Sequence, residues 1–401
     1  MHRLAGSFFD WSTLPASAPG PHSLWEFLLT TILSDGATKL AGAMMYTAFG
    51  SILSQVILRS GLVSQLISFA AEYAGESKYL LAGIMVLVVA FCFTSVTGLG
   101  AVIMIGSLVM PILVGAGISS SFAVCLMLMA IAWGGIFNPA VFGFYVDTLH
   151  ISPDDMRSFV IAYGTMFGIA TMAFFFVQGW RERHSFNWSA PAPAPAAPGK
   201  RLPFYAFITP ILPIVLILLK MPIIPAFIVG MLWGVLTTNF KNCISELTAS
   251  ILEGVKDISP VFGLFMGIGM ALNAMMAEPT KAVLAPLLES VVPSTALPFV
   301  IFFSLLAPLA LYRGPLNFYG LGAGIAGLLS GAQLLPNVAI MAAFFSVGQI
   351  QGVCDPTNTS NVWLGQLSKV STGHMLKKTI PYVWIFCCVA LIWAVYYKGV
   401  L

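Results

Sequence analysis

QGVCDPTNTSN at residues 351–361 and GGIFNPAVFGF at residues 134–144 interrupt two long apolar stretches of the chain. Each string has a proline, Pro356 or Pro139, directly after an Asp or an Asn. Proline removes a backbone donor and clashes with the carbonyl four residues back, so a helix breaks there. At membrane depth, non-helical backbone is tolerated only where it is buried in protein or lines a cavity. The two strings therefore predict two broken transmembrane helices whose breaks lie in the protein interior.

The composition is that of a membrane protein. Of the 401 residues, 58% are hydrophobic and 8% are charged, whereas a soluble domain has about 25% charged residues. The composition predicts the fold class of an all-α polytopic membrane protein. Its partner is the lipid bilayer in which it is embedded. The net charge of +3 is spread along the chain and forms no basic stripe, which excludes nucleic acid as a partner. The six cysteines include no CxxC pair, so no metal or other cofactor is expected.

The second half of the chain repeats the first at an offset of 217 residues. Gly135 falls on Gly352, and the tip TGLG at 97–100 falls on GPLN at 314–317. Few residues are identical, but the order and length of the elements agree. Two repeats of this kind are the pattern of many secondary transporters.

Each repeat is predicted to contain five elements: a crossing helix, an amphipathic stretch along the interface, a re-entrant hairpin, a broken helix and a last crossing helix. In the first half they lie at about 40–59, 62–74, 79–116, 121–150 and 158–180. In the second half they lie at about 257–277, 280–291, 295–331, 337–371 and 380–398. Two further crossings, at about 203–219 and 223–238, precede the second unit. The first unit has no counterpart to them, because segment 24–34 is too short to cross.

The chain then divides into four parts. Residues 1–34 form an N-terminal segment, which is a truncated scaffold if the chain starts late. Residues 35–185 form the first repeat and residues 203–401 form the second. Residues 186–202 join them and contain APAPAPAAPGKR, a stiff proline-rich spacer without packing side chains.

The basic residues predict the orientation. If the hairpins do not cross, five crossings separate the starts of the two units, and this odd number inverts the second unit. One side then carries Arg59, Lys78, Arg181, Arg183, Lys200, Arg201, Lys241, Lys256, Lys369, Lys377 and Lys378. The other side carries Arg3, Lys39, Arg157, Lys220, Lys281 and Lys398. The positive-inside rule puts the first side in the cytoplasm and the C-terminus outside.

Four loops, at 95–100, 135–143, 313–317 and 354–361, are predicted to meet near the membrane midplane as the binding site. The N-termini of half-helices suit an anion, and their carbonyl ends suit a cation. The candidate substrate-binding residues are Ser95, Thr97, Gly98, Asn138, Arg313, Gly314, Asn317, Thr357, Asn358 and Thr359. The candidate residues for the coupling ion, a proton or Na⁺, are Asp355 and Asn361.

Each candidate also has a structural interpretation. The guanidinium of Arg313 can bind a carboxylate in bidentate fashion, or it can be a loop arginine that snorkels to the outer interface. A buried Asp355 can titrate or bind a cation, or it can cap the half-helix that follows. The other polar candidates can bind the substrate or cap the broken helix ends.

At these loops the chain resembles the ion transporter superfamily of secondary carriers, which includes citrate, gluconate, lactate and C4-dicarboxylate permeases. The resemblance covers about residues 35–401 and lies in the order of elements and in the tip TGLGA at 97–101. It implies a homodimer in which a scaffold domain holds a transport domain that moves as an elevator. The chain lacks the paired Ser-Asn-Thr signature of the sodium-dicarboxylate branch and the early scaffold helices.

The predicted function is secondary active transport: proton- or sodium-coupled symport of a small organic anion, a carboxylate, across a bacterial cytoplasmic membrane. The alternative is a cation/proton antiporter that uses Asp355 and in which Arg313 is structural. An intramembrane enzyme is a different class, but the sequence has no HExxH motif and no GxSxG elbow. A channel is the fourth class, and two dissimilar loop sets fit a binding site better than a uniform pore ring.

Overall fold

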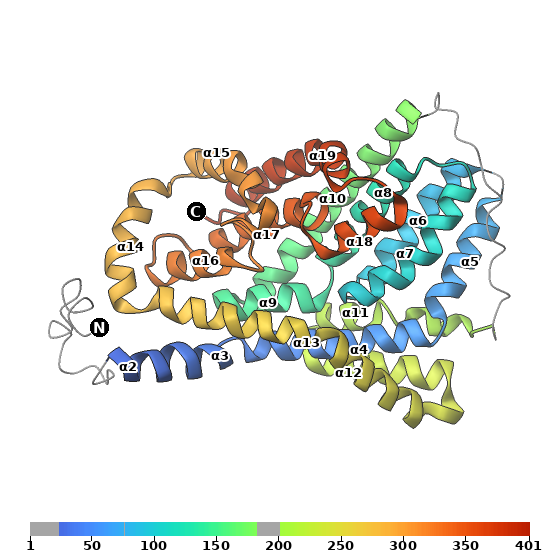
Figure 1. The fold of residues 1–401 in the computed structure, drawn as a ribbon, viewed down its shortest axis with the longest axis horizontal. Helices are drawn as coiled ribbons and strands as arrows, with labels where there is room; N and C mark the ends of the chain where they lie inside the picture. Colours follow the sequence, from blue (N-terminus) through green and yellow to red (C-terminus); the bar gives the residue numbers. More distant parts are fainter. Residues whose placement is uncertain (1–23, 76, 183–200) are drawn as a thin grey trace.

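The computed structural model describes residues 24–75, 77–182 and 201–401, which form helices and connecting turns without a β-strand. Seven of the described helical stretches are long and apolar enough to cross a membrane: Trp25–Arg59, Gly98–Gly115, Pro153–Glu182, Phe240–Met276, Ala296–Arg313, Asn337–Ser368 and Thr372–Tyr397. The pair Ser120–Ile136 and Pro139–Leu149, bent by 56°, counts as an eighth. The predicted all-α, multi-spanning class of fold is therefore confirmed (Figure 1).

The first half of the chain contains all the elements predicted for one unit. Its segments are α2 (Leu24–Phe27), η2 (Leu28–Asp35), α3 (Gly36–Thr38), α4 (Ala41–Arg59), α5 (Leu62–Ala74), α6 (Lys78–Phe93), α7 (Gly98–Gly115), α8 (Ser120–Ile136), α9 (Pro139–Leu149) and α10 (Pro153–Glu182). Here α6 and α7 are the arms of the first hairpin, and α8 and α9 are the halves of the first broken helix. The predicted linker lies outside the described residues except for Arg201 and Leu202.

The second half has the same order of elements after a short insertion. Its segments are η3 (Phe204–Ile208), α11 (Leu212–Leu218), α12 (Ile223–Thr238), η4 (Phe240–Asn242), α13 (Cys243–Met276), α14 (Glu278–Val291), α15 (Ala296–Leu306), η5 (Ala307–Arg313), α16 (Leu321–Gly331), α17 (Asn337–Cys354), α18 (Thr359–Ser368), α19 (Thr372–Ile392) and η6 (Trp393–Tyr397). A shift of 217 moves the start of α8, Ser120, onto the start of α17, Asn337. The same shift moves α5 to 279–291, which is α14 within one residue at its start.

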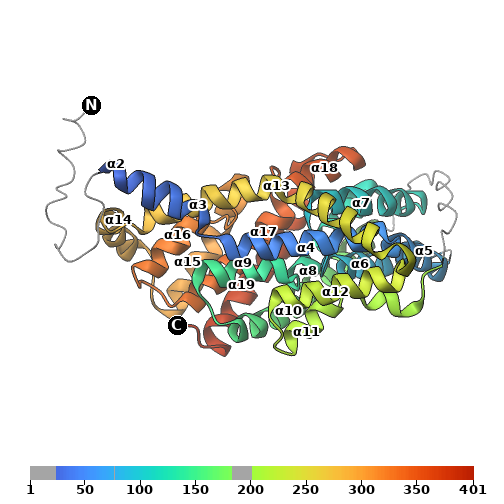
Figure 2. The ribbon, with the colours of Figure 1, turned by 90° about the horizontal axis from the view of Figure 1, so that it is seen from below.

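Helices α4 and α13 lie side by side and run in opposite directions (Figures 1 and 2). Gly36, before α4, lies against Met270 near the end of α13, whereas Arg59 at the end of α4 binds Glu246 near the start of α13. Helices α10 and α19 are antiparallel in the same way, because Phe159 packs on Trp393 and Gln178 reaches Tyr382.

The two amphipathic helices lie at opposite ends of this bundle. Helix α5 runs across one end and α14 runs across the other (Figures 1 and 2). Because α5 leads directly into the first hairpin and α14 directly into the second, the two hairpins enter the bundle from opposite ends.

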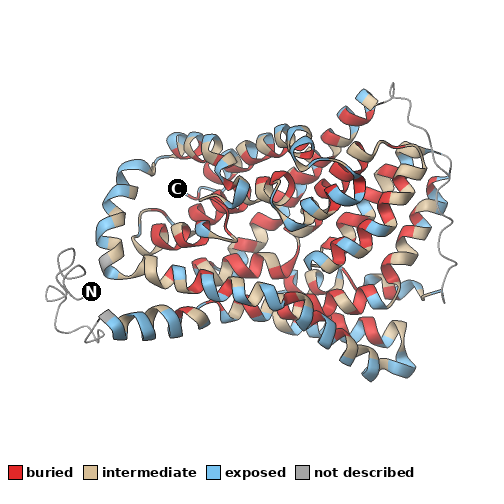
Figure 3. Ribbon diagram, in the orientation of Figure 1, coloured by how far each residue is buried: buried red, intermediate tan, exposed pale blue. Residues whose placement is uncertain are grey.

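The core is built around the first halves of the two broken helices. Every residue from 122 to 130 in α8 and from 339 to 347 in α17 is buried, and these two runs are also 217 apart. A helix that is apolar on all sides must be surrounded by other helices. Figure 3 shows this buried centre, with exposed residues concentrated on α14, α2 and the outer side of α13.

Two predicted elements need correction. Residues 24–38 are helical and extend the first crossing helix, so segment 24–34 belongs to that helix. The crossing predicted at 203–219 is wrong, because η3 and α11 are separate pieces with a turn at Thr209–Ile211. Pro210 and Pro213 account for this break, since proline cannot donate a helical hydrogen bond. Helix α11 instead packs back on α12.

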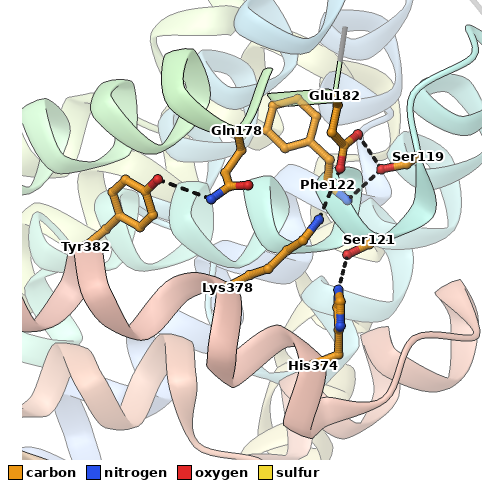
Figure 4. Close-up of polar contacts among 8 residues, drawn as sticks. All are labelled: Ser119, Ser121, Phe122, Gln178, Glu182, His374, Lys378 and Tyr382. Carbon is orange, nitrogen blue, oxygen red and sulfur yellow. Dashed lines mark hydrogen bonds and ion pairs between the residues drawn. The ribbon is translucent and has the colours of Figure 1, made fainter. Parts of the chain in front are cut away.

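A polar network fastens one end of the core. Lys378 on α19 pairs with Glu182 on α10 at 3.1 Å, and Ser119 before α8 donates to the same carboxylate (Figure 4). On the same helix, His374 contacts Ser121 at 2.8 Å. The Lys378 and Glu182 side chains are 23% and 16% exposed, so their attraction is screened less than that of a surface pair.

Two neighbouring glycines predict a sharp contrast in stability. A Cβ on Gly134 would lie 2.1 Å from the Ala90 carbonyl oxygen, whereas one on Gly135 would meet nothing within 4 Å. Overpacking of this kind costs about 1–3 kcal/mol. We therefore expect Gly134→Ala to lower the thermal unfolding temperature in detergent by several degrees and Gly135→Ala to leave it unchanged or raised. Equal unfolding temperatures for both variants would contradict the close packing of α6 on α8.

Candidate functional site

The first helix break is held together by Asn138. Its Oδ1 accepts from the Ala140 N–H at 3.0 Å and so caps α9. Its Nδ2 donates to the carbonyls of Phe93 and Val96, at 3.1 and 3.3 Å, in the tip of the first hairpin. Asn138 is 1% exposed. One buried side chain therefore caps the half-helix and fixes the hairpin tip against it.

The second break is longer. Here one residue caps the half-helix, and another residue binds the hairpin tip. Asn358 caps α18 by accepting from the Ser360 N–H at 3.1 Å. Asp355 accepts from the N–H and hydroxyl of Thr357, at 2.8 and 2.7 Å, and from the Arg313 N–H at 3.3 Å. The N-cap role that the sequence offered for Asp355 therefore belongs to Asn358.

The two breaks bind their hairpin tips at equivalent positions. Asn138 and Asp355 are 217 residues apart, as are their partners Val96 and Arg313. In the first half of the chain the amide side chain donates to a backbone carbonyl, and in the second half the carboxylate accepts from a backbone N–H. The carboxylate of Asp355 is fully buried and has no ion pair with any described residue, which is an uncommon arrangement in a protein interior.

A cavity of about 190 Å³ lies where the two breaks meet. It is lined by the last turn of α8 at Gly135, the first turn of α9 at Val141, the last turn of α17 at Gly352 and the first turn of α18 at Asn361. Asn317, in the loop of the second hairpin, completes the wall. Two half-helix N-termini and two half-helix C-termini thus surround one small space, which offers partial positive and negative charge to a ligand.

The cavity wall combines amides, hydroxyls and aromatic rings. No Asp, Glu, Lys, Arg or His is among the described residues that line it. Tyr145 stacks on Phe318 with ring centroids 4.1 Å apart and forms one side. Asn361 is 2% exposed and its Oδ1 has no hydrogen-bond partner among the described residues. A buried amide oxygen without a donor is rare in native proteins, and a ligand donor or a cation would satisfy it.

Three of the predicted site residues line this cavity: Asn317, Asn358 and Asn361. The candidates in the first hairpin tip lie elsewhere. Ser95 is buried and donates its hydroxyl to the Pro210 carbonyl, while the carbonyl of Thr97 accepts from Ser54.

The other candidates in the second half of the chain lie outside the cavity. Arg313, Thr357 and Thr359 are exposed. Gly314 lies in the tightly packed hairpin tip. There is no space for a side chain there, because a Cβ would lie 2.0 Å from the Leu309 carbonyl oxygen. Gly98, in the first tip, has a φ of +89°, which glycine adopts without strain.

Two amide side chains of the cavity wall were not predicted. Gln349 and Gln351 lie in the apolar helix α17 and both line the cavity. The sequence could have indicated both residues. Burying two side-chain amides in a predicted membrane helix costs free energy, so such residues usually have a function.

The structure also reveals a carboxylate inside the membrane-spanning region that was not predicted. Asp257 lies near the middle of α13 and accepts from Gln55 of α4 at 2.5 Å. A Cβ on Gly100 would lie 3.0 Å from the Asp257 Oδ2, so the carboxylate lies against the first turn of α7. The positive end of that helix stabilises a negative charge at this position.

This contact predicts a role for Asp257 in holding the first hairpin against α4 and α13. We expect Asp257→Asn to lower the rate of the predicted anion uptake into proteoliposomes about tenfold. This factor corresponds to about 1.4 kcal/mol of free energy. Glu253→Gln is the matched control, because Glu253 is on the same helix, exposed, and pairs only with the exposed Lys256 among the described residues. Uptake that falls equally in both variants would show a general charge effect and contradict the contact.

Two helix breaks beside one cavity, in described residues with seven helical stretches long enough to cross a membrane, define a polytopic α-helical membrane protein. The chain matches no protein-family model and no curated protein. Among solved structures it is similar to the YdaH transporter of Alcanivorax borkumensis, with 12% identity over 94% of this chain and 90% of that chain and a TM-score of 0.66. It is also similar to MtrF of Neisseria gonorrhoeae, which is described among antimetabolite efflux pumps, with 12% identity over 92% and 84% of the chains and a TM-score of 0.58. At this identity the likeness shows a shared fold.

Proposed function

We propose that the chain is a secondary active transporter that carries a small organic anion by proton- or sodium-coupled symport across a bacterial cytoplasmic membrane. The observation that carries this proposal is the cavity between the two helix breaks, where two half-helix N-termini converge. Helix N-termini attract anions through the positive end of the helix dipole. At α9 the first N–H groups already bond to Asn138, so there the dipole supplies the attraction. The transporters of similar fold support the general class.

In this proposal the anion is held by helix ends and amides rather than by an arginine. Arg313 is exposed and does not line the cavity, so its alternative interpretation as a loop arginine is favoured. Asn317 and Gln351 supply side-chain amides to the cavity wall instead. The coupling ion is assigned to Asp355 and Asn361, because the first is a buried carboxylate and the second has a buried oxygen without a partner.

We further propose that the two halves are inverted repeats and that transport follows an elevator mechanism in a homodimer. The antiparallel pairing of α4 with α13 and the hairpins that enter from opposite ends support the inversion. Because α11 packs back on α12, the two together return the chain to the side it left. The number of crossings between α4 and α13 therefore stays odd, and the C-terminus is assigned to the outside.

The alternative, a cation/proton antiporter, rests on the same buried Asp355. Here the cation would bind between Asp355 and the carbonyl ends of the breaks, and no organic anion would be carried. The resemblance to the ion transporter superfamily remains a proposal in either case.

Ligand-induced stabilisation distinguishes the two. In detergent, an organic anion that fits the cavity is expected to raise the thermal unfolding temperature, since a ligand at 100 times its Kd adds about 2.7 kcal/mol. Citrate, gluconate, lactate and succinate are tested with and without Na⁺. Stabilisation by one anion supports symport, whereas stabilisation by a monovalent cation alone, with no effect of any anion, contradicts it and favours the antiporter.

A further inference from the structure

A second cavity, of about 390 Å³, lies at the end of the bundle marked by α5 in Figure 1. It is bounded by the last turns of α4 and α12, by one side of α5 along most of its length, and by the N-terminal part of α13. Residue 201, where the chain returns after the proline-rich spacer, lies at its rim. Because α4 ends and α13 begins here, and both belong to stretches long enough to cross a membrane, we place the cavity at the depth where lipid headgroups meet the protein.

Four charged side chains line this cavity. Two of them pair with each other, and the other two, one positive and one negative, can bind a ligand. Arg59 is already paired with Glu246, because its Nε and Nη2 both donate to the carboxylate at 3.3 Å. Arg201 and Glu72 also line the cavity, and neither has an ion pair with another described residue. The cavity therefore presents a guanidinium and a carboxylate to the same occupant.

The buried side of the cavity holds a hydroxyl without a partner. Ser250, on α13, is 1% exposed and lines the cavity, and its Oγ has no hydrogen-bond partner among the described residues. A serine inside a helix commonly bonds back to the carbonyl four residues earlier. An unmet buried hydroxyl costs about 1–3 kcal/mol, and an oxygen-rich ligand would remove that cost.

An apolar groove lies next to this cavity on the outer surface. It runs between α5 and α6 and is lined by apolar side chains such as Leu66, Ile84 and Val88. Phe69 and Glu72 line both the groove and the polar cavity, so the two spaces adjoin at these side chains. Tyr73, which also lines the groove, is 81% exposed, as is typical of tyrosines at a membrane interface.

We propose that this combined site binds one phospholipid whose headgroup carries both a phosphate and an ammonium group, as in phosphatidylethanolamine. The phosphate binds Arg201, with Ser250 donating to a phosphate or ester oxygen. The ammonium group binds Glu72, and an acyl chain lies in the groove past Phe69. Pockets with basic residues between membrane helices are known to hold lipid headgroups. This lipid would fasten α5, the entry to the first hairpin, to α4 and α13.

The test is native mass spectrometry of the full chain, purified in detergent, stripped of lipid and titrated with phosphatidylethanolamine or phosphatidylglycerol of identical acyl chains. We expect one phosphatidylethanolamine per chain, with at least about a tenfold preference over phosphatidylglycerol. Arg201→Ala is expected to weaken binding of both lipids about tenfold. Glu72→Lys is expected to reverse the preference, because the new ammonium group repels ethanolamine and attracts anionic lipid. Both substituted residues are exposed, so we expect both variants to fold like the wild type, which thermal unfolding in detergent checks.

Two controls test whether lipid binding depends on this cavity and on the acyl chains. Lys241→Ala removes an exposed basic residue at the same end that does not line the cavity, and it should bind lipid like the wild type. Glycerophosphoethanolamine, the headgroup without chains, should bind at least tenfold more weakly than the lipid. Equal binding of the two lipids to the wild type, an unchanged Arg201→Ala variant, or a free headgroup that binds as tightly as the lipid would each overturn the proposal.

Discussion

Gly352→Leu is expected to reduce uptake at least about a hundredfold, equivalent to about 2.7 kcal/mol, while the protein stays folded. Gly352 lines the central cavity, and a Cβ built on it meets nothing within 4 Å. The leucine side chain therefore enters the cavity of about 190 Å³ without striking the backbone. Its presence removes the space in which a small anion would lie between the two half-helix N-termini.

The matched control for this variant is Gly267→Leu. Gly267 lies in α13, is exposed, and also has open space at its Cβ. Replacing a helical glycine gains up to about 1 kcal/mol of helix propensity, so neither variant should unfold at a lower temperature. Uptake by proteoliposomes and thermal unfolding in detergent are measured together. Full uptake by Gly352→Leu would show that the substrate does not pass through this cavity.

Asp355→Asn is expected to abolish gradient-driven accumulation and to leave counterflow exchange of the anion within about threefold of the wild type. The amide keeps an oxygen that accepts from Thr357, but it neither titrates nor attracts a cation. Asn138, 217 residues earlier, shows that an asparagine fits a helix break of this fold. A loss of at least tenfold in accumulation corresponds to about 1.4 kcal/mol or more.

Exchange and accumulation need to be measured on the same proteoliposomes. Asp154→Asn is the charge-matched control, because Asp154 is exposed at the start of α10 and should alter neither activity. If Asp355→Asn accumulates substrate like the wild type, Asp355 does not couple the ion gradient. If the folded variant loses exchange as well, Asp355 is needed for the transport cycle itself and not for coupling alone.

The helices were largely predictable because local chemistry determines them. Pro139 and Pro356 each break an apolar helix, and both breaks occur where they were expected. The amphipathic stretch predicted at 62–74 is helix α5, because its polar and apolar residues alternate at helical spacing. The 217-residue offset also carried into the structure, since the buried runs 122–130 and 339–347 coincide under it.

The neighbours of the hairpin tips were not predictable in the same way. Ser95 and Thr97 were expected to face a substrate, but they bind Pro210 and Ser54, which come from other parts of the chain. Hydropathy tells which segments enter the membrane and does not tell which side chains face each other. For the same reason Asp257 was missed, because its partner Gln55 is 202 residues away.

The most direct test of the central claim is uptake of labelled citrate, gluconate, lactate and succinate into proteoliposomes, with pH and Na⁺ gradients imposed separately. We predict that one of these anions accumulates under one of the two gradients and that Gly352→Leu stops it. The account is contradicted if no anion enters under either gradient and a monovalent cation instead dissipates the pH gradient.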